Sequence, residues 1–488
     1  MAKRRDTLTA VLFLAGILAG AVFLILGLLV EPGFDHPTRP SHFTLRTKAS
    51  VIHQVELGRE ELVKSKQNPA DLPSRPTSSR ARRSADSALR SLDRAIVGHA
   101  TPPVVTLEQR IQAAEEFIDA TEPAINEILD REHTFIQLYG GIQRLAGRRV
   151  VQDMDPQYTV VKLTDHLVTF AALESVQNDM SVRAEEMVEF AQRIKREYRI
   201  PFLYVQAPSK LDMAPLPDGI PNYADAQADQ FLRILKENRV DALDLRPAFR
   251  AVAKDDPLAV EEYFFHTDHH WTPAGAFLGY QTLCEALEKD YGFEIEEEWT
   301  DKEEFNRYTF HDAFLGSQGR RVGSLYVGLD DFEIWSPKFS NDFTYVVPLS
   351  GVTRKGPFAV SLLFPERLSE TSYYDTNQYT IYAGGDYLLS RAYNEQNPDG
   401  KRVLILRDSF GCALTPFLAI ASGEVMAIDP RQFNGSQDTM LDFVDWLKPD
   451  MVMVMNSTGS LEVDKLFPYL PTAYEAIQAG KAAGGAEN

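Results

Sequence analysis

The chain has 488 residues, 44% hydrophobic and 25% charged, which is the composition of a globular protein of about two to three domains. Fifty basic residues against 70 acidic ones give a net charge of -20, which argues against nucleic acid as a partner. The only two cysteines, Cys284 and Cys412, exclude a disulfide framework, and two buried thiols are favoured over a single bridge.

The N-terminal region carries a membrane-targeting signal. Residues 8–30 are apolar and uncharged, long enough for a helix that crosses a bilayer, whose core needs about 20 residues. Lys3, Arg4 and Arg5 precede this stretch and Glu31 follows it, so positive charges mark the cytoplasmic side. We expect a single-pass anchor in the cell membrane, with the rest of the chain extracytoplasmic. The alternative, a cleaved signal peptide, normally has a shorter apolar region of about 7–15 residues.

The anchor segment, 1–31, is followed by residues 32–104, which are rich in Ser, Pro, Arg and Ala, chiefly after residue 64. Such a composition predicts a flexible extracytoplasmic linker. Residues 105–475 then form the expected folded domain, and the small, polar end of the chain, 476–488, is expected to be disordered.

The folded domain begins with apolar residues at helical spacing over 107–118 and 124–138, followed by short strand patterns at 158–161 and 166–170. Helices and strands then alternate. Helices are expected over 180–198, 224–237, 412–421 and 437–447, and strands over 201–206, 240–245, 402–406, 424–428 and 451–455. This alternation predicts a three-layer α/β/α fold with a mostly parallel sheet. Residues 293–387, rich in aromatics, Gly and Asp, are expected to form a β-rich insertion.

Polar residues follow four of the expected strands. Because ligands bind beyond the carboxyl ends of parallel strands, these residues are expected to meet at one edge of the sheet. They are Ser209, Lys210, Asp408, Ser409, Asp429, Arg431 and Asn456. Lys210 itself is expected to cap its strand in solvent.

Ser409 lies in the sequence Arg-Asp-Ser-Phe-Gly, between an apolar strand and the start of a helix. It is a candidate nucleophile, and the backbone N–H groups of Ser409 and Phe410 would point at a developing oxyanion at the helix N-terminus. The alternative is that Asp408 and Ser409 only cap this helix.

The segment His-Thr-Asp-His-His-Trp, 266–271, supplies a candidate base. On an extended segment Asp268 and His270 face the same way, as a carboxylate that orients an imidazole must. Three imidazoles and a carboxylate could instead bind a metal, but contiguous residues cannot easily surround one ion. Thr272 and Pro273 predict the start of a helix, and Trp271 is expected to fill the core and exclude water.

Asp268-His269-His270-Trp271, together with Ser409 in Asp-Ser-Phe, resembles the DHHW family and the wider group of alginate O-acetyltransferase-like, SGNH-hydrolase-like proteins. Gly384-Gly385-Asp386 and Asp429-Pro430-Arg431 flank this match, which covers about residues 105–470. The chain departs from the family at Arg407, where Gly-Asp-Ser has glycine.

The resemblance implies a triad of Ser409, His270 and Asp268 that transfers acetyl groups to a secreted or cell-surface polysaccharide, beside a multispanning membrane O-acyltransferase and without a cofactor. An O-acetylesterase with the same triad, or a non-catalytic glycan-binding or scaffold subunit, are the alternatives. Gly385 and Asn456 are candidate oxyanion donors. Arg431 either binds an anionic sugar or pairs with Asp429. The glycine-rich stretch 316–323 is interpreted as a mobile lid.

Overall fold

The computed structural model describes residues 133–171, 177–256, 258–369, 373–374 and 376–484. The expected anchor over 8–30, the linker over 32–104 and the helix over 107–118 lie outside these residues. Within the described ranges, none of the helices combines the length and the apolar character that a bilayer crossing requires.

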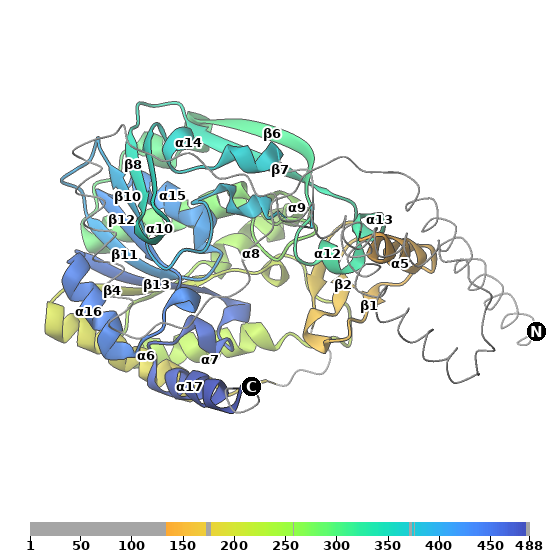
Figure 1. Cartoon of the computed structure of the whole chain (residues 1–488), viewed down its shortest axis with the longest axis horizontal. Coiled ribbons are helices and arrows are strands. Elements are labelled where there is room, and N and C mark those ends of the chain that lie inside the picture. Colours follow the sequence, from red (N-terminus) through yellow and green to blue (C-terminus); the bar gives the residue numbers. More distant parts are fainter. Residues whose placement is uncertain (1–132, 172–176, 257, 370–372, 375, 485–488) are drawn as a thin grey trace, which may run out of the picture. The chain divides into compact units, whose positions relative to one another are not determined.

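A central sheet of eight strands organises the fold (Figure 1). Five strands are parallel, and in sheet order they are β5 (Ala242–Asp244), β4 (Phe202–Ala207), β13 (Met451–Ser457), β11 (Arg402–Arg407) and β12 (Glu424–Ile428). Three antiparallel strands extend the sheet beyond β12, namely β10 (Ser390–Asn394), β8 (Phe343–Val347) and β9 (Val352–Gly356).

The sheet is therefore mixed: its five parallel strands agree with the expectation of a mostly parallel sheet, and strands of the expected β-rich insertion extend it. Strands β8 and β9 belong to the expected insertion, yet they continue the central sheet. All five residues of β8 are buried, and the strand is paired with β10 on one side and with β9 on the other. Within the expected insertion, β6 (Phe305–Phe314) and β7 (Asp330–Pro337) pair with each other apart from the central sheet.

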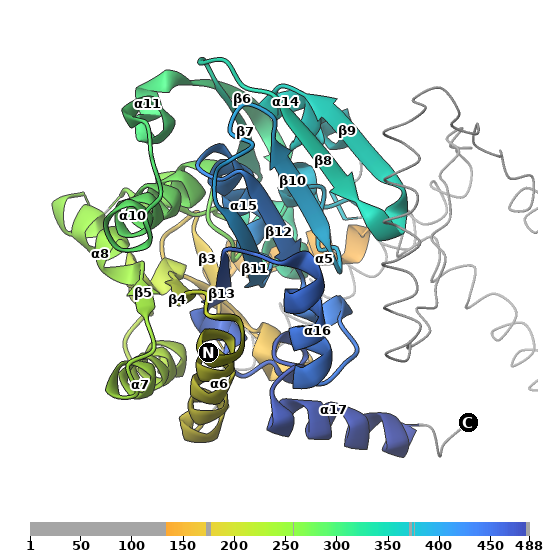
Figure 2. The same ribbon diagram turned by 90° about the vertical axis from the view of Figure 1, so that its left-hand side faces the viewer.

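Helices cover both faces of the parallel strands (Figure 2). One face packs against α6 (Ser181–Arg193), α7 (Tyr223–Glu237), α16 (Gln437–Leu447) and α17 (Pro471–Gly484). The other packs against α8 (Arg246–Asp255), α10 (Pro273–Tyr291) and α15 (Gly411–Ile420). Alternate residues of β11 enter the two cores, Leu404 and Leu406 on one side and Val403 and Ile405 on the other. The expected three-layer α/β/α arrangement is confirmed.

The rest of the described chain forms smaller elements. These are the sheet β1 (Val150–Val151), β2 (Val160–Lys162) and β3 (Val168–Phe170), and the helices α5 (Thr134–Leu145), α9 (Val260–Tyr263), α11 (Glu297–Thr300), α12 (Gly319–Val322), α13 (Ser324–Val327) and α14 (Phe358–Ser361).

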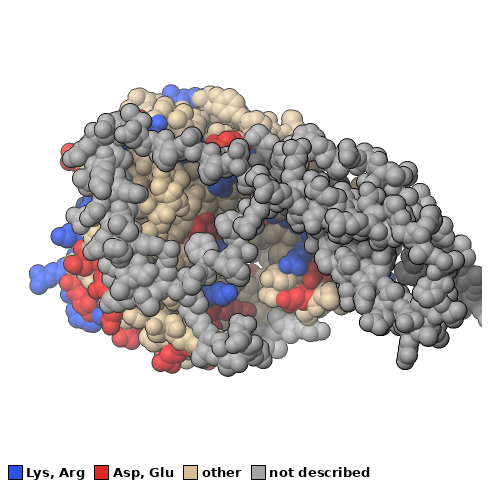
Figure 3. All heavy atoms as spheres, viewed as in Figure 1, with Lys and Arg blue, Asp and Glu red and all other residues tan. Residues whose placement is uncertain are grey.

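On the face shown in Figure 3, acidic and basic side chains of the described residues are interspersed.

Two expected boundaries were wrong. The helix expected over 124–138 does not run through residue 133, because His133 has a left-handed backbone with φ 44° and α5 begins after it. The tail expected to be disordered from 476 continues α17 as far as residue 484, because its alanines favour helix.

Candidate active site

Polar residues gather at the carboxyl ends of the parallel strands, as the sequence predicted. Strands β4, β13, β11 and β12 are neighbours and parallel, so the residues that follow them lie at the same edge. Ser409 is the second residue after β11 and stands just before α15. It is half-buried, in contrast to the fully buried residues of the strand before it.

Asp408 fixes the turn that carries Ser409. Its buried carboxylate accepts hydrogen bonds from the amides of Phe410 (3.0 Å) and Ser457 (2.7 Å) and from the hydroxyl of Ser460 (2.6 Å). Because Ser457 is the last residue of β13 and Ser460 follows it, the turn after β11 is tied to the neighbouring strand. Asp408 is thus more than a helix cap, since it holds the candidate nucleophile in place.

The segment that carries His270 is held at both ends. Before it, the buried carboxylate of Asp330, the first residue of β7, accepts hydrogen bonds from the amides of His266 and Thr267. After it, the Thr272 hydroxyl accepts a hydrogen bond from the Gly275 amide and caps α10, as the sequence predicted. The loop between the two ends therefore has little freedom.

Asp268, His270 and Ser409 come together into a hydrogen-bonded row. Nε2 of His270 lies 2.6 Å from Oγ of Ser409, and Nδ1 of His270 is hydrogen-bonded to Oδ1 of Asp268. Oδ1 of Asp268 also accepts the His270 amide at 3.0 Å, and Oδ2 accepts the Ser317 amide at 2.6 Å. The separation between His270 and Ser409 is within the reach that a general base needs.

The electrostatics of the row favour an ionised carboxylate. Burial by itself would raise the pKa of Asp268, but the charges of His270 and His269 and the hydrogen bonds to the carboxylate hold that pKa well below its usual range. An ionised Asp268 keeps the proton of His270 on Nδ1. Nε2 is then free to accept the hydroxyl proton of Ser409.

Aromatic side chains hold the His270 ring. Tyr379 stacks on it, with ring centroids 3.9 Å apart and planes 12° apart, and His269 packs against it at 3.8 Å. The Tyr379 hydroxyl and the Trp271 indole both donate to the carbonyl oxygen of Phe410, at 3.2 and 3.1 Å. The aromatic residues thus connect the segment of the base to the turn of the nucleophile.

Trp271 is fully buried and packs against Phe410, so its predicted place in the core is confirmed. Tyr379 was not found from the sequence. It belongs to a short 3-10 turn, Gln378–Ile381, inside the region expected to be an insertion, and no local pattern connects that turn to His270.

The glycine-rich stretch 316–323 forms a wall behind Asp268, and its interpretation as a lid was wrong. A Cβ atom on Gly316 would lie only 2.1 Å from Cβ of Asp268, so the two backbones are packed together. The Gly316 amide donates to the hydroxyl of Thr267 at 2.7 Å, and the hydroxyl of Ser317 lies 2.8 Å from Nδ1 of His269. These contacts make the stretch part of the support of the site.

Lys210 was expected in solvent but is buried. Its ammonium donates to the carbonyls of Val168 (2.6 Å) and His266 (3.2 Å) and to the side-chain oxygen of Gln318 (2.9 Å). Burial lowers the pKa of Lys210 to about 7, against the opposing charges of Asp330 and Asp268. Lys210 therefore connects β3, the His270 segment and the wall behind Asp268.

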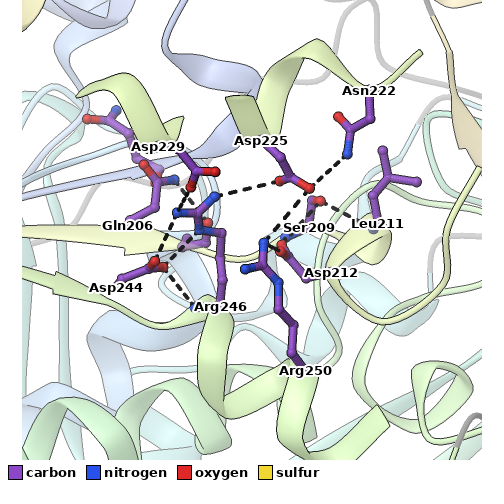
Figure 4. A network of polar contacts seen from close by, with 12 residues as sticks. Gln206, Ser209, Leu211, Asp212, Asn222, Asp225, Asp229, Asp244, Arg246 and Arg250 are labelled. Atoms are coloured by element: carbon purple, nitrogen blue, oxygen red, sulfur yellow. Dashed lines mark hydrogen bonds and ion pairs between the residues drawn. The ribbon is translucent and has the colours of Figure 1, made fainter. Parts of the chain in front are cut away.

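A network of carboxylates and guanidinium groups anchors the turn that carries Lys210 (Figure 4). Asp212, two residues later, accepts hydrogen bonds from the Ser209 amide and from Arg250. In the same view the buried guanidinium of Arg246 lies among Asp225, Asp229 and Asp244. The network lies beyond the ends of β4 and β5 and supports the site from outside.

The groups expected to donate hydrogen bonds to an oxyanion differ in whether they already have a partner. The Phe410 amide donates to Asp408, so it is not free for an oxyanion, which corrects that prediction. The Ser409 amide has no hydrogen-bond partner among the described residues. Asn456 lies beside Asp408 at the same edge, and its buried Oδ1 lacks a partner within the described part of the chain.

Gly385 and Arg431 belong to a separate ion-pair cluster. Asp386 lies between the guanidinium groups of Arg431 (2.7 Å) and the buried Arg407, and Arg407 also donates to the Gly385 carbonyl at 2.9 Å. Arg431 pairs as well with Asp429 at 2.7 Å. Arg407, the departure from the family pattern, therefore points its charge into this cluster.

Asp268, His269 and His270 are also the one group within the described ranges whose side chains could together hold a metal ion, with ligand atoms within 4.8 Å of one another. Oδ1 of Asp268 and Nδ1 of His270 are already bonded to each other, and Nδ1 of His269 is bonded to Ser317. The two cysteines are free and buried, as expected.

A sheet with helices on both faces, carrying a serine, a histidine and an aspartate at its carboxyl edge, defines an SGNH hydrolase-like α/β protein. Residues 258–428 match the sequence model of the DHHW proteins, and residues 170–308 match that of the SGNH hydrolase-like domain of the acetyltransferase AlgX. The chain is thus similar to the DHHW proteins and to the AlgX domain over parts of its folded region. No curated protein matches the sequence.

Two solved structures of Bacillus cereus PatB1 show the same fold. Bacillus cereus PatB1 with a sulfonyl adduct is 21% identical, with a TM-score of 0.51 over 65% of this chain and 98% of PatB1. A second PatB1 structure is 22% identical, with a TM-score of 0.50 over 65% of this chain and 99% of PatB1. A DHHW family protein from Eubacterium siraeum is 19% identical, with a TM-score of 0.49 over 66% and 97% of the two chains.

Proposed function

We propose that the protein is an extracytoplasmic, serine-dependent O-acetyltransferase that acts on a cell-surface or secreted polysaccharide through an acetyl group carried on Ser409. The observation that carries the proposal is the 2.6 Å contact between Nε2 of His270 and Oγ of Ser409, with Asp268 behind the ring. The match to an acetyltransferase family model supports the choice of the acetyl group.

In the first half-reaction Oγ of Ser409 attacks the carbonyl carbon of an acetyl ester while Nε2 of His270 takes the hydroxyl proton. The tetrahedral intermediate collapses when the bond to the donor oxygen breaks, and that oxygen receives the proton from His270. The products are acetyl-Ser409 and the donor alcohol. Asp268 stays ionised throughout and stabilises the positively charged ring.

In the second half-reaction a sugar hydroxyl attacks the acetyl carbon of acetyl-Ser409 and gives its proton to His270. Oγ of Ser409 leaves and takes that proton back, so the enzyme is restored and the sugar is acetylated. If water attacks instead, the product is acetate. The same residues therefore serve an O-acetylesterase, which is the nearest alternative.

The negative charge of each intermediate needs a donor, and the Ser409 amide is the first candidate because it has no partner among the described residues. It stands just before α15, a helix of ten residues whose N-terminal end favours negative charge. Asn456, at the same edge, is the candidate for a second donor.

The setting of the reaction rests on the sequence and on the resemblance. An anchor over 8–30 would keep the domain outside the cell membrane, where polysaccharide acceptors are found. A multispanning membrane O-acyltransferase is the proposed source of acetyl groups. Arg407, the departure from the family pattern, would favour a non-catalytic scaffold, but its guanidinium pairs with Asp386 and donates to the Gly385 carbonyl, and His270 still contacts Ser409.

The test measures release of p-nitrophenol from its acetate ester by the purified chain and by Ser409→Ala and His270→Ala variants. We expect each variant to lose at least about a thousandfold in kcat/KM, whereas Ser422→Ala, a buried serine at the opposite edge of the sheet, keeps the wild-type rate. Mass spectrometry should find an acetyl group on the Ser409 peptide. Equal rates in all four proteins would leave only the scaffold.

Transferase and esterase are separated by adding an oligosaccharide acceptor. A transferase forms acetylated oligosaccharide and releases less acetate as the acceptor concentration rises. An esterase releases acetate at the same rate with or without the acceptor.

A further inference from the structure

Helix α5 presents its apolar side chains outward. Five large apolar residues follow the spacing of one helix face and are between 43% and 91% exposed, namely Phe135, Leu138, Tyr139, Ile142 and Leu145. We call these five residues the α5 face. Leu325 of α13, which is 56% exposed, lies against Gly141 of the same helix.

The opposite side of α5, which packs against the protein, is small and polar. A Cβ on Gly140 would lie 1.7 Å from the carbonyl oxygen of Val322, so α5 and α12 are in direct contact. The Gln137 side chain accepts hydrogen bonds from the hydroxyl of Ser324 and the amide of Leu325, both at 3.1 Å. A helix whose polar side is buried and whose apolar side is exposed needs a further partner.

The surroundings of the α5 face are basic. Arg144, Arg148 and Arg149 are exposed, and none of them pairs with a carboxylate in the part of the chain that the structure describes. The pKa of Lys162 is lowered by partial burial and then by the charge of Arg144. A partner that covers the α5 face should therefore combine apolar and acidic side chains. The basic surroundings are local, because the chain as a whole carries an excess of acidic residues.

The residues directly before α5 have that chemistry. Residues 107–132 contain eight acidic side chains against two basic ones, a net charge of -6, and apolar residues at helical spacing. The chain enters α5 through His133, whose left-handed backbone turns it away from the helix axis. A preceding segment that reverses direction here can return along α5, as in an αα-hairpin.

We propose that residues 107–132 are the cover of the α5 face, with their apolar side chains on it and their acidic side chains beside Arg144, Arg148 and Arg149. The expected membrane linker ends where this cover begins. α5 packs on α12, which belongs to the glycine-rich stretch behind Asp268. The linker is then joined to the folded domain on the side of the site where Asp268 lies.

The experiment follows hydrogen exchange of the α5 amides in the full-length chain. Phe117→Asp, at an apolar position of the cover, should speed exchange of residues 134–145 by at least about tenfold. Gln112→Asp adds the same charge at a polar position about 140° around the expected helix from Phe117 and should leave exchange unchanged. A carbodiimide, which joins carboxylates to amines, should link Lys162 of the unaltered chain to acidic residues within 108–132.

Three results would overturn the proposal. One is equal α5 exchange in both variants without any link to Lys162. A second is α5 protection that appears only when vesicles of anionic lipid are added, which would make the partner a membrane surface. The third is a concentration-dependent dimer that Ile142→Asp dissociates and Phe117→Asp does not, which would make the partner a second copy of the chain.

Discussion

Gly316 touches Asp268 so closely that a single added methyl group should disable the site. In Gly316→Ala the new Cβ would lie 2.1 Å from Cβ, 2.5 Å from Cα and 2.6 Å from Oδ2 of Asp268. Carbon atoms in contact need about 3.5 Å, so one of the two segments must move by about 1.4 Å. The backbone of Gly316 is not in the left-handed region, so the expected effect is steric.

The magnitude follows from the place of Asp268 in the row. A displacement of about 1 Å at a positioning group costs about a hundredfold in rate, or about 2.7 kcal/mol in activation free energy. Overpacking should also lower the free energy of unfolding by about 1–3 kcal/mol. Both effects arise because Gly316 and the base segment are fastened to each other through Thr267.

The assay compares kcat/KM for p-nitrophenyl acetate and the urea midpoint of Gly316→Ala with those of the wild type. Gly459→Ala is the matched control, because a Cβ at that position meets no atom within 4 Å. We expect the control to match the wild type in both measurements. A Gly316→Ala protein with wild-type activity and stability would refute the idea that this stretch supports Asp268.

Three further predictions concern other parts of the site. Tyr379→Leu removes the ring stacked on His270, whereas Tyr379→Phe keeps it. We expect Tyr379→Leu to lower kcat/KM at least about tenfold more than Tyr379→Phe and to shift the pH profile of kcat/KM. A purely structural role of Tyr379 would change only the melting temperature. Burial would raise the pKa of Asp386, but the charges of Arg407 and then Arg431 hold that pKa well below its usual range. The ionised carboxylate of Asp386 therefore stabilises the fold above about pH 4, and this stabilisation is lost as the pH falls further. Asp386→Asn should therefore lower the free energy of unfolding by about 3 kcal/mol at pH 7, because it leaves Arg407 without its carboxylate. Urea titrations between pH 3 and 7 should show that the stability of the variant depends less on pH at the acid end than that of the wild type. An unchanged pH dependence would contradict this. Burial raises the pKa of both thiols, that of Cys284 to about 12, so a thiol reagent should react only in denaturant, and rapid reaction of the native protein would show that the site region opens.

Local patterns predicted much of the α/β unit. The apolar runs of β4, β11, β12 and β13 are long and continuous, as expected of strands that are buried on both faces, and their bounds lie within about two residues of the prediction. The antiparallel strands β8 and β9 were expected only as parts of a β-rich insertion, because strand pairing between distant segments leaves no local signal for their place in the central sheet.

The site shows the same division. Asp268, His270 and Ser409 were recognised because their residue types and local spacing suit the chemistry, and the structure brings them together. The supports of the site were missed or misread. Lys210 looked like a surface cation and Tyr379 like an ordinary residue of an insertion.

The sequence by itself determined which segments become buried strands and which of their ends carry polar side chains, because burial and backbone preference act over a few residues. The tertiary structure alone decided which groups meet. Asp408 holds the turn of Ser409 through residues 49 and 52 positions away, and it also occupies the Phe410 amide. Gly316 supports Asp268 from a distant segment. Such contacts depend on the order of strands in the sheet, which no stretch of the sequence encodes alone.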